Sequence, residues 1–402
     1  MSGKEQQYIQ EAFDTNWVVP LGPNVNGFET DLKQFVGQDK EVVALSAGTA
    51  AVHLALLACG VGPGDEVLVQ SFTFCASSHP ITYLGATPVF VDSEKDTWNM
   101  DPELLEKAIK DRIEKTGKKP KAIVPVYLYG MPAKINKIMA VANKYDIPVI
   151  EDAAEGLGSR YDGQVCGTFG KYGVLSFNGN KMITTSGGGA LICSDAESKK
   201  EIMFYATQAR EAYPYYQHKH IGYNYRLSNI CAGIGRGQMT VLEEHVNHHK
   251  HIYELYKAAF ANVKGITLHE NPSKEYDSNF WLNTIVLDED LHIPGEEHAY
   301  ETKIEGAVGG AAGVTHAAES LHTDCEPNRN VEAMRMALDA AGIESRPLWK
   351  PMHKQPVYAE APAYVNGVSE LLFKKGLCLP SGPCVSDEDV EYIISNILKL
   401  IK

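Results

Sequence analysis

The stretch KYGVLSFNGNKMITTSGGG, residues 171–189, decides how this sequence is interpreted. Its first part, Lys171–Phe177, predicts a short buried strand. The turn signal Asn178-Gly-Asn180 follows, then Lys181, and then the three glycines 187–189. A solvated surface lysine is the ordinary interpretation of such a residue. Only the rest of the chain can show whether a lysine between a strand end and a glycine run has a special role.

Composition narrows the class of protein. The chain has 402 residues, of which 44% are hydrophobic, enough for a large core and for two domains or more. The net charge of −14 and the lack of a Lys/Arg tract disfavour nucleic acid and anionic membranes as partners, but leave room for a local phosphate pocket. Eight cysteines without a C-x-x-C pair predict reduced thiols and a cytoplasmic location. We expect no signal peptide in Met1–Asp14, and the uncharged stretch Val42–Gly64 is too interrupted for a membrane span.

Through the first 240 residues, short apolar runs alternate with longer helical patterns. This rhythm predicts an α/β fold with a mostly parallel sheet covered by helices on both faces, a three-layer αβα arrangement. One helix is expected to begin at Pro102 behind Asp101, and another to span Ala133–Lys144. The predicted strands are Glu66–Gln70, Pro88–Val91, Ala122–Val126 and Pro148–Glu151.

The pattern changes in the C-terminal part. From Leu227 it turns helical, which suggests a bridge between domains. We therefore predict a large α/β domain over 15–240, and a second unit over 241–402 that consists of a bridging helix and a smaller α+β domain. Residues 1–14 are expected to pack near this second unit. The elements expected there are a strand over Phe280–Val286, a helix over Val331–Ala341, a last helix capped by Ser386, and a loop-rich insertion over 290–330.

Polar groups follow several predicted strands, where open α/β sheets bind ligands. The turn at Gly48-Thr49 offers helix N–H groups to an anion, although an ordinary strand-to-helix turn looks the same. Asp152 closes an apolar strand, so it needs a cationic partner or caps a helix. The Ser176 hydroxyl suits a phosphate or caps the strand end. Phe74 suits a flat ligand or the core.

Taken with Lys181, these groups match pyridoxal phosphate. A lysine amine forms an imine with the aldehyde of this cofactor, and an aspartate keeps its ring nitrogen protonated so that the ring can accept electrons. The glycines after Lys181 leave room for a bulky substrate. The lysine is thus predicted to be a covalent anchor and a proton carrier.

Five motifs in order give the chain a recognisable likeness. It resembles the sugar-nucleotide aminotransferases of the DegT/StrS type, a branch of the fold-type I pyridoxal phosphate enzymes, from about Pro20 to Ile401 without the 290–330 insertion. The motifs are Ser46-Ala-Gly-Thr-Ala-Ala51, Gly62-Pro-Gly-Asp-Glu-Val67, Glu151-Asp-Ala-Ala154, Ser176-Phe177 with Lys181, and Gly222-Tyr-Asn-Tyr-Arg226.

The resemblance implies roles for residues around the cofactor. Lys181 and Asp152 are the implied catalytic residues, the lysine attached to the cofactor and the aspartate paired with its ring nitrogen. The implied cofactor-binding residues are Gly48, Thr49, Ala50 and Ser176 at the phosphate, Phe74 on the ring, and Glu155, where the family often has glutamine. Asn224 is implied to reach the phosphate of the neighbouring subunit, so the resemblance implies a homodimer with shared active sites.

The resemblance also implies a substrate. Tyr127, where many members have histidine, Arg226, and Met352 with His353 are implied substrate-binding residues. Three segments resemble the enzymes that make UDP-4-amino-4,6-dideoxy-N-acetylglucosamine from a 4-keto sugar nucleotide and L-glutamate, and GDP-perosamine synthases share much of this pattern. These segments are Gly22-Pro-Asn-Val-Asn26, Ser176–Lys181 and Arg346–His353.

Other classes fit less well. Neither the G-x-G-x-x-G of nicotinamide enzymes nor a P-loop motif is present. His245 and His249 have the spacing of a metal pair, but they lie in a charged stretch without H-E-x-x-H, so we expect no metal. Lys181 argues against the related sugar dehydratases, which have histidine at this position, and a non-catalytic sensor of the cofactor remains open.

Overall fold

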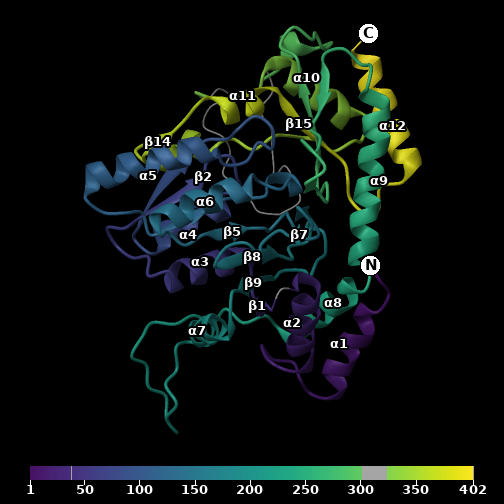
Figure 1. Cartoon of the computed structure of the whole chain (residues 1–402). Coiled ribbons are helices and arrows are strands. Elements are labelled where there is room, and N and C mark those ends of the chain that lie inside the picture. Colours follow the sequence, from purple (N-terminus) through teal and green to yellow (C-terminus); the bar gives the residue numbers. More distant parts are fainter. Residues whose placement is uncertain (38, 301–323, 402) are drawn as a thin grey trace.

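The computed structural model describes residues 1–37, 39–300 and 324–401. Its centre is a twisted sheet with helices on both faces (Figure 1). The strand order is β14-β3-β2-β4-β5-β8-β9-β1, in which isolated bridges, Ile123 to Val149 and Val126 to Asp152, join β4 to β5. The strands are β1 (Glu41–Leu45), β2 (Glu66–Gln70), β3 (Thr87–Val91), β4 (Ala122–Val124), β5 (Ile150–Asp152), β8 (Tyr172–Ser176), β9 (Gly189–Cys193) and β14 (Ala363–Tyr364).

Within the described chain, β9 is the strand of this sheet that runs antiparallel to its neighbours, β8 and β1. The other pairs are parallel. The mostly parallel sheet is therefore confirmed. β9 is reversed because the chain returns directly from β8 through the turn that carries Lys181.

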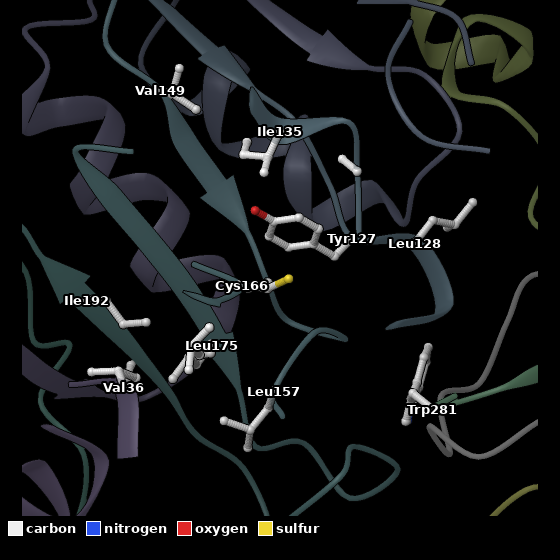
Figure 2. Packing of buried hydrophobic residues seen from close by; sticks show 14 of the residues in the cluster. Val36, Tyr127, Leu128, Ile135, Val149, Leu157, Cys166, Leu175, Ile192 and Trp281 are labelled. Atoms are coloured by element: carbon white, nitrogen blue, oxygen red, sulfur yellow. The ribbon is translucent and has the colours of Figure 1, made fainter. Parts of the chain in front are cut away.

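Both faces of the sheet are buried, as the three-layer prediction requires. In β2, Leu68 belongs to one apolar cluster while Val67 and Val69 belong to another, because successive side chains point to opposite faces. Figure 2 shows part of the first cluster, with Leu175 of β8 near Ile192 of β9. The helices of this region are α2 (Pro23–Val36), α3 (Gly48–Ala58), α4 (His79–Tyr83), α5 (Pro102–Thr116), α6 (Ile135–Tyr145) and α7 (Ala196–Ala206).

Local signals account for the helix ends. The Asp101 side chain accepts hydrogen bonds from the N–H groups of Glu103 and Leu104, and Pro102 occupies the first helical position of α5. Gly117 ends this helix in the left-handed conformation, at φ 69°. Ser386 and Asp389 form a capping box at the start of α12 (Asp387–Leu400).

The C-terminal part has its own sheet and apolar core. The predicted helical run from Leu227 consists of α8 (Asn229–Met239) and the long α9 (Leu242–Phe260), which stands beside the large sheet in Figure 1. The sheet is antiparallel, in the order β10-β12-β15-β13, and its core includes residues of α9, α10 and α12. The remaining elements are β10 (Ile266–Leu268), β12 (Asn283–Leu287), α10 (Arg329–Ala340), β13 (Arg346–Pro347), α11 (Val368–Lys375) and β15 (Gly376–Leu379).

A small sheet and several short helical turns complete the fold. The small sheet consists of β7 (Gln164–Val165), β6 (Arg160–Tyr161) and β11 (Tyr276–Asp277). In the described residues, no helix combines the length and the apolar character that crossing a membrane requires. Short 3-10 turns lie at Cys75–Ser77, Leu128–Gly130, Glu296–His298, Met352–Lys354 and Pro356–Tyr358.

Two elements lie across the predicted domain division. Helix α1 (Glu5–Asp14) packs on α8 of the large domain, where Gln238 donates to the Glu5 carboxylate at 2.6 Å, and Tyr8 of α1 lines a surface cavity together with Leu242 of α9. Strand β14 comes from the predicted small domain but extends the large sheet, because the Phe90 N–H donates to the Pro362 carbonyl at 2.8 Å. Within the predicted insertion over 290–330, residues 301–323 lie outside the described residues.

Candidate active site

A cavity of about 430 Å³ opens at the carboxyl ends of the parallel strands. This volume falls in the range of small-molecule sites. Segments that follow β1, β2, β5 and β8 line it, and Trp281 and Trp349 approach from the C-terminal part. The predicted residues that line the cavity are Gly48, Thr49, Phe74, Asp152, Glu155, Ser176 and Lys181. The strand ends thus bring together seven residues that are far apart in the sequence.

Lys181 is fixed by the groups around its ammonium. Its Nζ lies 3.2 Å from Oε1 of Glu155 and 4.1 Å from the centre of the Trp281 ring. The Trp281 indole N–H donates to the carbonyl of Asn180 at 2.8 Å, which ties the ring to the turn before the lysine. An ion pair and a cation–π contact therefore direct the amine into the cavity.

Asp152 ends β5 with its carboxylate buried. The Ser77 hydroxyl donates to its Oδ2 at 2.6 Å, and the N–H of Ala154 donates to Oδ1 at 3.1 Å. Burial raises the pKa of this carboxyl, and both hydrogen bonds and the charge of Lys181 oppose the rise. Among the described residues, no Lys or Arg nitrogen lies within ion-pair distance of Asp152. The Asp152 carboxylate is therefore available to pair with a cationic group of a ligand.

Glu155 connects the Lys181 ammonium to the backbone at Tyr129. Its Oε2 accepts from the Tyr129 N–H at 2.7 Å, while Oε1 contacts Lys181. Burial raises the pKa of Glu155, and the Lys181 charge opposes the rise. The carboxylate and the ammonium therefore stabilise each other inside the protein.

The turn at the start of α3 is shaped for an anion. No side chain caps this helix, so its first N–H groups remain available to a ligand, beside the Ser176 hydroxyl. A Cβ on Gly48 would lie 3.0 Å from Cβ of Ser176. A Cβ on Gly189 would lie 2.4 Å from the backbone of Ala47 and Gly48, so this glycine lets β9 approach the turn.

These features fit the three functional groups of pyridoxal phosphate: its phosphate, its ring nitrogen and its aldehyde. The α3 turn and Ser176 suit the phosphate, Asp152 suits the protonated ring nitrogen, and Lys181 supplies an amine for the aldehyde. Phe74 is 54% exposed at the cavity wall and offers its ring to a flat ligand. Of the predicted glycines, 187 and 188 line the cavity, whereas Gly189 serves the packing of β9.

Two residues predicted to contact the substrate do not line this cavity, Tyr127 and Arg226. Tyr127 is 1% exposed and donates from its hydroxyl to the buried Glu151, and Figure 2 shows its ring in the apolar cluster. Arg226 donates from Nη1 to Glu29 at 2.6 Å and to the Ala44 carbonyl at 2.9 Å, away from the cavity. Both side chains satisfy buried partners of the fold instead of a ligand.

The other predicted residues do not line this cavity. His353 is held by the Ser71 hydroxyl, 2.6 Å from Nδ1, and by Glu370, 3.2 Å from Nε2, and its contact with a substrate stays a prediction. Met352 lines a neighbouring cavity. Ala50 is buried one residue beyond the lining Thr49, and Asn224 is exposed, so its role toward a second subunit stays a prediction.

Sequence reasoning missed three residues of the site, Ser77, Trp281 and Trp349. Ser77 stands among several small polar residues after β2, and nothing local marks it as the partner of Asp152. Trp281 and Trp349 reach the cavity from the small domain, and local sequence patterns do not predict where that domain packs.

His245 and His249, which have the spacing of a metal pair, contact backbone carbonyls of the fold. Their Nδ1 atoms lie 3.2 Å and 3.1 Å from the carbonyls of Met182 and Phe280. In the part of the chain that is described, no group of three potential ligands is placed for a metal.

Comparison with known proteins gives a consistent result. The profile of the DegT/DnrJ/EryC1/StrS aminotransferase family matches residues 1–308 and 296–398. EpsN of Bacillus subtilis, whose name describes a pyridoxal phosphate-dependent aminotransferase, is 44% identical over 100% of this chain and 94% of its own. A GDP-perosamine synthase of Escherichia coli O157:H7 is 34% identical over 99% of this chain and 95% of its own. A crystal structure of an aminotransferase of this family from Brucella abortus superposes with a TM-score of 0.84 at 29% identity, over 99% of this chain and 95% of that one.

These comparisons confirm three expectations: the family resemblance, the fold type I architecture and pyridoxal phosphate as the cofactor. The cavity agrees with them, because the groups that the cofactor needs lie at one edge of the sheet. The chain belongs to the DegT/DnrJ/EryC1/StrS aminotransferase family.

Proposed function

We propose that this chain is a cytoplasmic, homodimeric enzyme that transfers the amino group of L-glutamate to a nucleotide-linked 4-keto-6-deoxy sugar. The observation that carries the proposal is the position of the Lys181 ammonium, 3.2 Å from the Glu155 carboxylate in a cavity that also holds Asp152 and an uncapped helix start. This arrangement gives one amine, two buried carboxylates and one anion seat, groups that suit a transaminase of this family.

Each part of the cavity has a role toward the cofactor. The first N–H groups of α3 at Gly48, Thr49 and Ala50, with the Ser176 hydroxyl, would hold the phosphate. When bound, pyridoxal phosphate supplies an aldehyde that condenses with amines and a ring that withdraws electrons from the adjacent carbon. The Asp152 carboxylate would keep a proton on the ring nitrogen, and Ser77 holds that carboxylate in place.

Lys181 would also move protons. With the cofactor bound, its Nζ would take the proton from the α-carbon of the amino acid and hold it for transfer. Glu155 and Trp281 keep the amine at this position in the cavity. With the sugar substrate, the same Nζ would deliver a proton to the sugar carbon that receives the amine.

The preferred substrate is the UDP-linked, N-acetylated 4-keto-6-deoxy sugar, which gives UDP-4-amino-4,6-dideoxy-N-acetylglucosamine and 2-oxoglutarate. The resemblance of the segments 22–26, 176–181 and 346–353 supports this choice. The second candidate is the GDP-linked sugar of GDP-perosamine synthesis, favoured by the 34% identical relative of that name.

The surface supports a homodimer. The chain between α7 and α8 projects from the body as a long arm (Figure 1). This arm exposes Tyr215, Tyr216 and Ile221, of which Ile221 is 82% exposed. Side chains of this kind are typical of interfaces. Asn224 is exposed at the base of the arm, where a second subunit would meet it.

A panel assay tests the proposal. The purified protein, loaded with pyridoxal phosphate, is incubated with L-glutamate and with UDP- or GDP-linked 4-keto-6-deoxy sugars. We expect 2-oxoglutarate and a single amino sugar, with the UDP-linked N-acetylated substrate used best. Lys181→Ala should abolish turnover without unfolding the protein, and Asp152→Asn should weaken cofactor binding and slow turnover by orders of magnitude. If glutamate gives no 2-oxoglutarate, the chain is a sensor, and if the sugar is dehydrated without gaining an amine, it is a dehydratase.

A further inference from the structure

Glu155 contacts the amine on which the reaction depends. Its Oε1 lies 3.2 Å from Nζ of Lys181, and its Oε2 is fixed by the N–H of Tyr129 at 2.7 Å. In the described part of the chain, Lys181 is the one basic side chain within ion-pair distance of this carboxylate. Glu155 is therefore placed to exchange a proton with the groups that react at Lys181, as well as to hold the lysine in position.

The Glu155–Lys181 pair is buried, so a charge on one member alone is costly. Glu155 is 5% exposed, and burial raises the pKa of its carboxyl, while the Lys181 charge opposes the rise. When the lysine nitrogen is neutral, the carboxylate loses this countercharge and becomes an unpaired buried charge. Glu155 then takes up a proton readily, so it is a proton acceptor at the times when Lys181 is neutral.

Three other titratable groups face Glu155, and none of them can take its place. The Asp152 charge raises the pKa of Glu155, but Asp152 is held by Ser77 and is the residue proposed to pair with the ring nitrogen of the cofactor. Burial raises the pKa of the Tyr129 hydroxyl well above its usual value and that of the Cys378 thiol to about 12. Both of these groups keep their protons near neutral pH, which leaves Glu155 as the acceptor beside the lysine.

The transfer of an amino group from an amino acid needs two proton acceptors. The amino acid arrives as an ammonium and must lose one proton before its nitrogen can act as a nucleophile. A second proton then leaves the α-carbon, and Lys181 must be neutral to accept it. One amine cannot hold the first proton and still act as the base for the second, so another acceptor must lie beside it.

We propose that Glu155 is a second catalytic acid–base residue, which takes the ammonium proton of the incoming amino acid and returns it to the amine of the product. In the first half of the cycle, an N–H bond of the substrate breaks, an O–H bond forms on Glu155, and the nitrogen keeps the electron pair. Lys181 stays neutral and takes the proton of the α-carbon. In the second half, the O–H bond breaks and an N–H bond forms on the departing amino sugar. This inference rests on the proposed function, since it takes an amino acid as the amino donor.

The pH dependence of the glutamate half-reaction tests the proton transfer. Stopped-flow measurements on the cofactor-loaded wild type should show a kcat/KM for glutamate that changes little between about pH 7 and about pH 9. Glu155→Gln keeps the shape of the side chain and an acceptor for the Tyr129 N–H, but it cannot take up a proton. At about pH 7 this variant should be slower by roughly 10²- to 10⁴-fold. Its rate should rise about tenfold per pH unit, because each unit increases the neutral fraction of the glutamate amine by that factor.

Glu332→Gln is the matched control for this substitution. Glu332 is also a buried carboxylate in an ion pair, 2.6 Å from Arg335, and it does not line the cavity. This variant should keep the rate and the pH profile of the wild type. A recovery of Glu155→Gln toward the wild-type rate at high pH separates loss of a proton acceptor from damage to the site, which a higher pH would not repair.

The absorbance of the bound cofactor gives a second measurement, without amino acid and without turnover. The Glu155 charge favours a protonated nitrogen at Lys181, so Glu155→Gln should move the pH midpoint of the absorbance change downward by about 1–3 units. An unchanged pH profile of the rate in Glu155→Gln would overturn the inference even if this midpoint moves, because the charge would then act on the lysine alone. A tenfold rise per pH unit in the wild type itself would also overturn it, and either result leaves the proposed function intact. If the wild type releases no 2-oxoglutarate from glutamate at any pH, the proposed function is contradicted and the inference with it.

Discussion

The hydroxyl of Ser77 lies 2.6 Å from Oδ2 of Asp152, so the buried carboxylate of the site is held by a residue that is 75 positions away. Ser77 is 1% exposed, and because its only hydroxyl proton goes to Asp152, it accepts a hydrogen bond from the Thr73 hydroxyl at 2.8 Å. The segment after β2 therefore positions Asp152 for a cationic partner.

Ser77→Ala should weaken the binding of pyridoxal phosphate. Burial raises the pKa of Asp152, and without the Ser77 hydrogen bond the carboxyl holds its proton more firmly and binds a pyridinium less well. A hydrogen bond to a charged group contributes about 1.5–3 kcal/mol, so the dissociation constant should rise roughly 10- to 100-fold. Absorbance titration of the cofactor-free protein measures it. Ser78→Ala is the control, because this buried hydroxyl donates to the Cys75 carbonyl instead, and equal effects of the two substitutions would refute the role of Ser77.

Tyr127→Phe should affect stability and leave the substrate constants unchanged. The hydroxyl serves the buried Glu151, which also accepts from the N–H groups of Gly167, Phe169 and Gly170. Removal of one donor from this carboxylate should lower the free energy of unfolding by about 1–3 kcal/mol, measured by urea denaturation. Tyr145→Phe, which loses a bond to the partly exposed Glu106, should cost less. A large rise in KM for the sugar with unchanged stability would instead restore Tyr127 as a substrate contact.

The sequence predicted correctly those features of the fold that depend on residues adjacent in the chain. The strand β2, the Asp101 cap of α5 and the cavity residues Lys181 and Asp152 follow from local patterns, because strand ends and turns determine where these groups lie. Side-chain direction depends on distant partners. Arg226 turns toward Glu29, 197 positions away, so its place in a family motif did not reveal its role.

The docking of whole elements also escaped prediction. Helix α1 is short, and nothing in its own pattern indicates that it packs on α8. Strand β14 has two residues and pairs with β3 more than 270 positions earlier, as the Asn366 N–H to Asp92 bond beside it shows. Such contacts depend on the surface that the finished sheet presents, which local periodicity does not describe.

Gly189→Ala should damage both the sheet and the cofactor site. The added Cβ would lie 2.4 Å from the backbone of Ala47 and Gly48, which cannot move without shifting β1 or the start of α3. We expect a loss of about 1–3 kcal/mol in the free energy of unfolding and weaker cofactor binding. In the matched variant Gly187→Ala, the new Cβ meets no atom within 4 Å, so stability should change little. Thermal melts of both variants, with and without cofactor, measure these effects. Equal melting temperatures of the two variants would show that β9 can shift to accommodate the added Cβ.

His249 gives the protein a defined sensitivity to acid. The ring is 2% exposed on α9, its Nδ1 lies 3.1 Å from the Phe280 carbonyl, and burial lowers its pKa to about 4, with the charges of His248 and His245 acting in the same direction. Since the unfolded chain binds a proton at an ordinary pKa of about 6.5, the stabilisation present above that pH is lost as the pH falls toward 4.

His249→Asn should remove this part of the acid sensitivity, because the asparagine amide can still donate to the Phe280 carbonyl but does not titrate. Between about pH 7.5 and about pH 5, the wild type should lose roughly 2 kcal/mol more of its free energy of unfolding than the variant, since each pKa unit corresponds to about 1.4 kcal/mol. Urea denaturation at the two pH values measures the difference. His251→Asn is the control, because His251 is exposed and pairs with Asp387 at 2.8 Å, and this variant should keep the wild-type dependence. Parallel curves for the wild type and His249→Asn would show that the ring takes up its proton without unfolding.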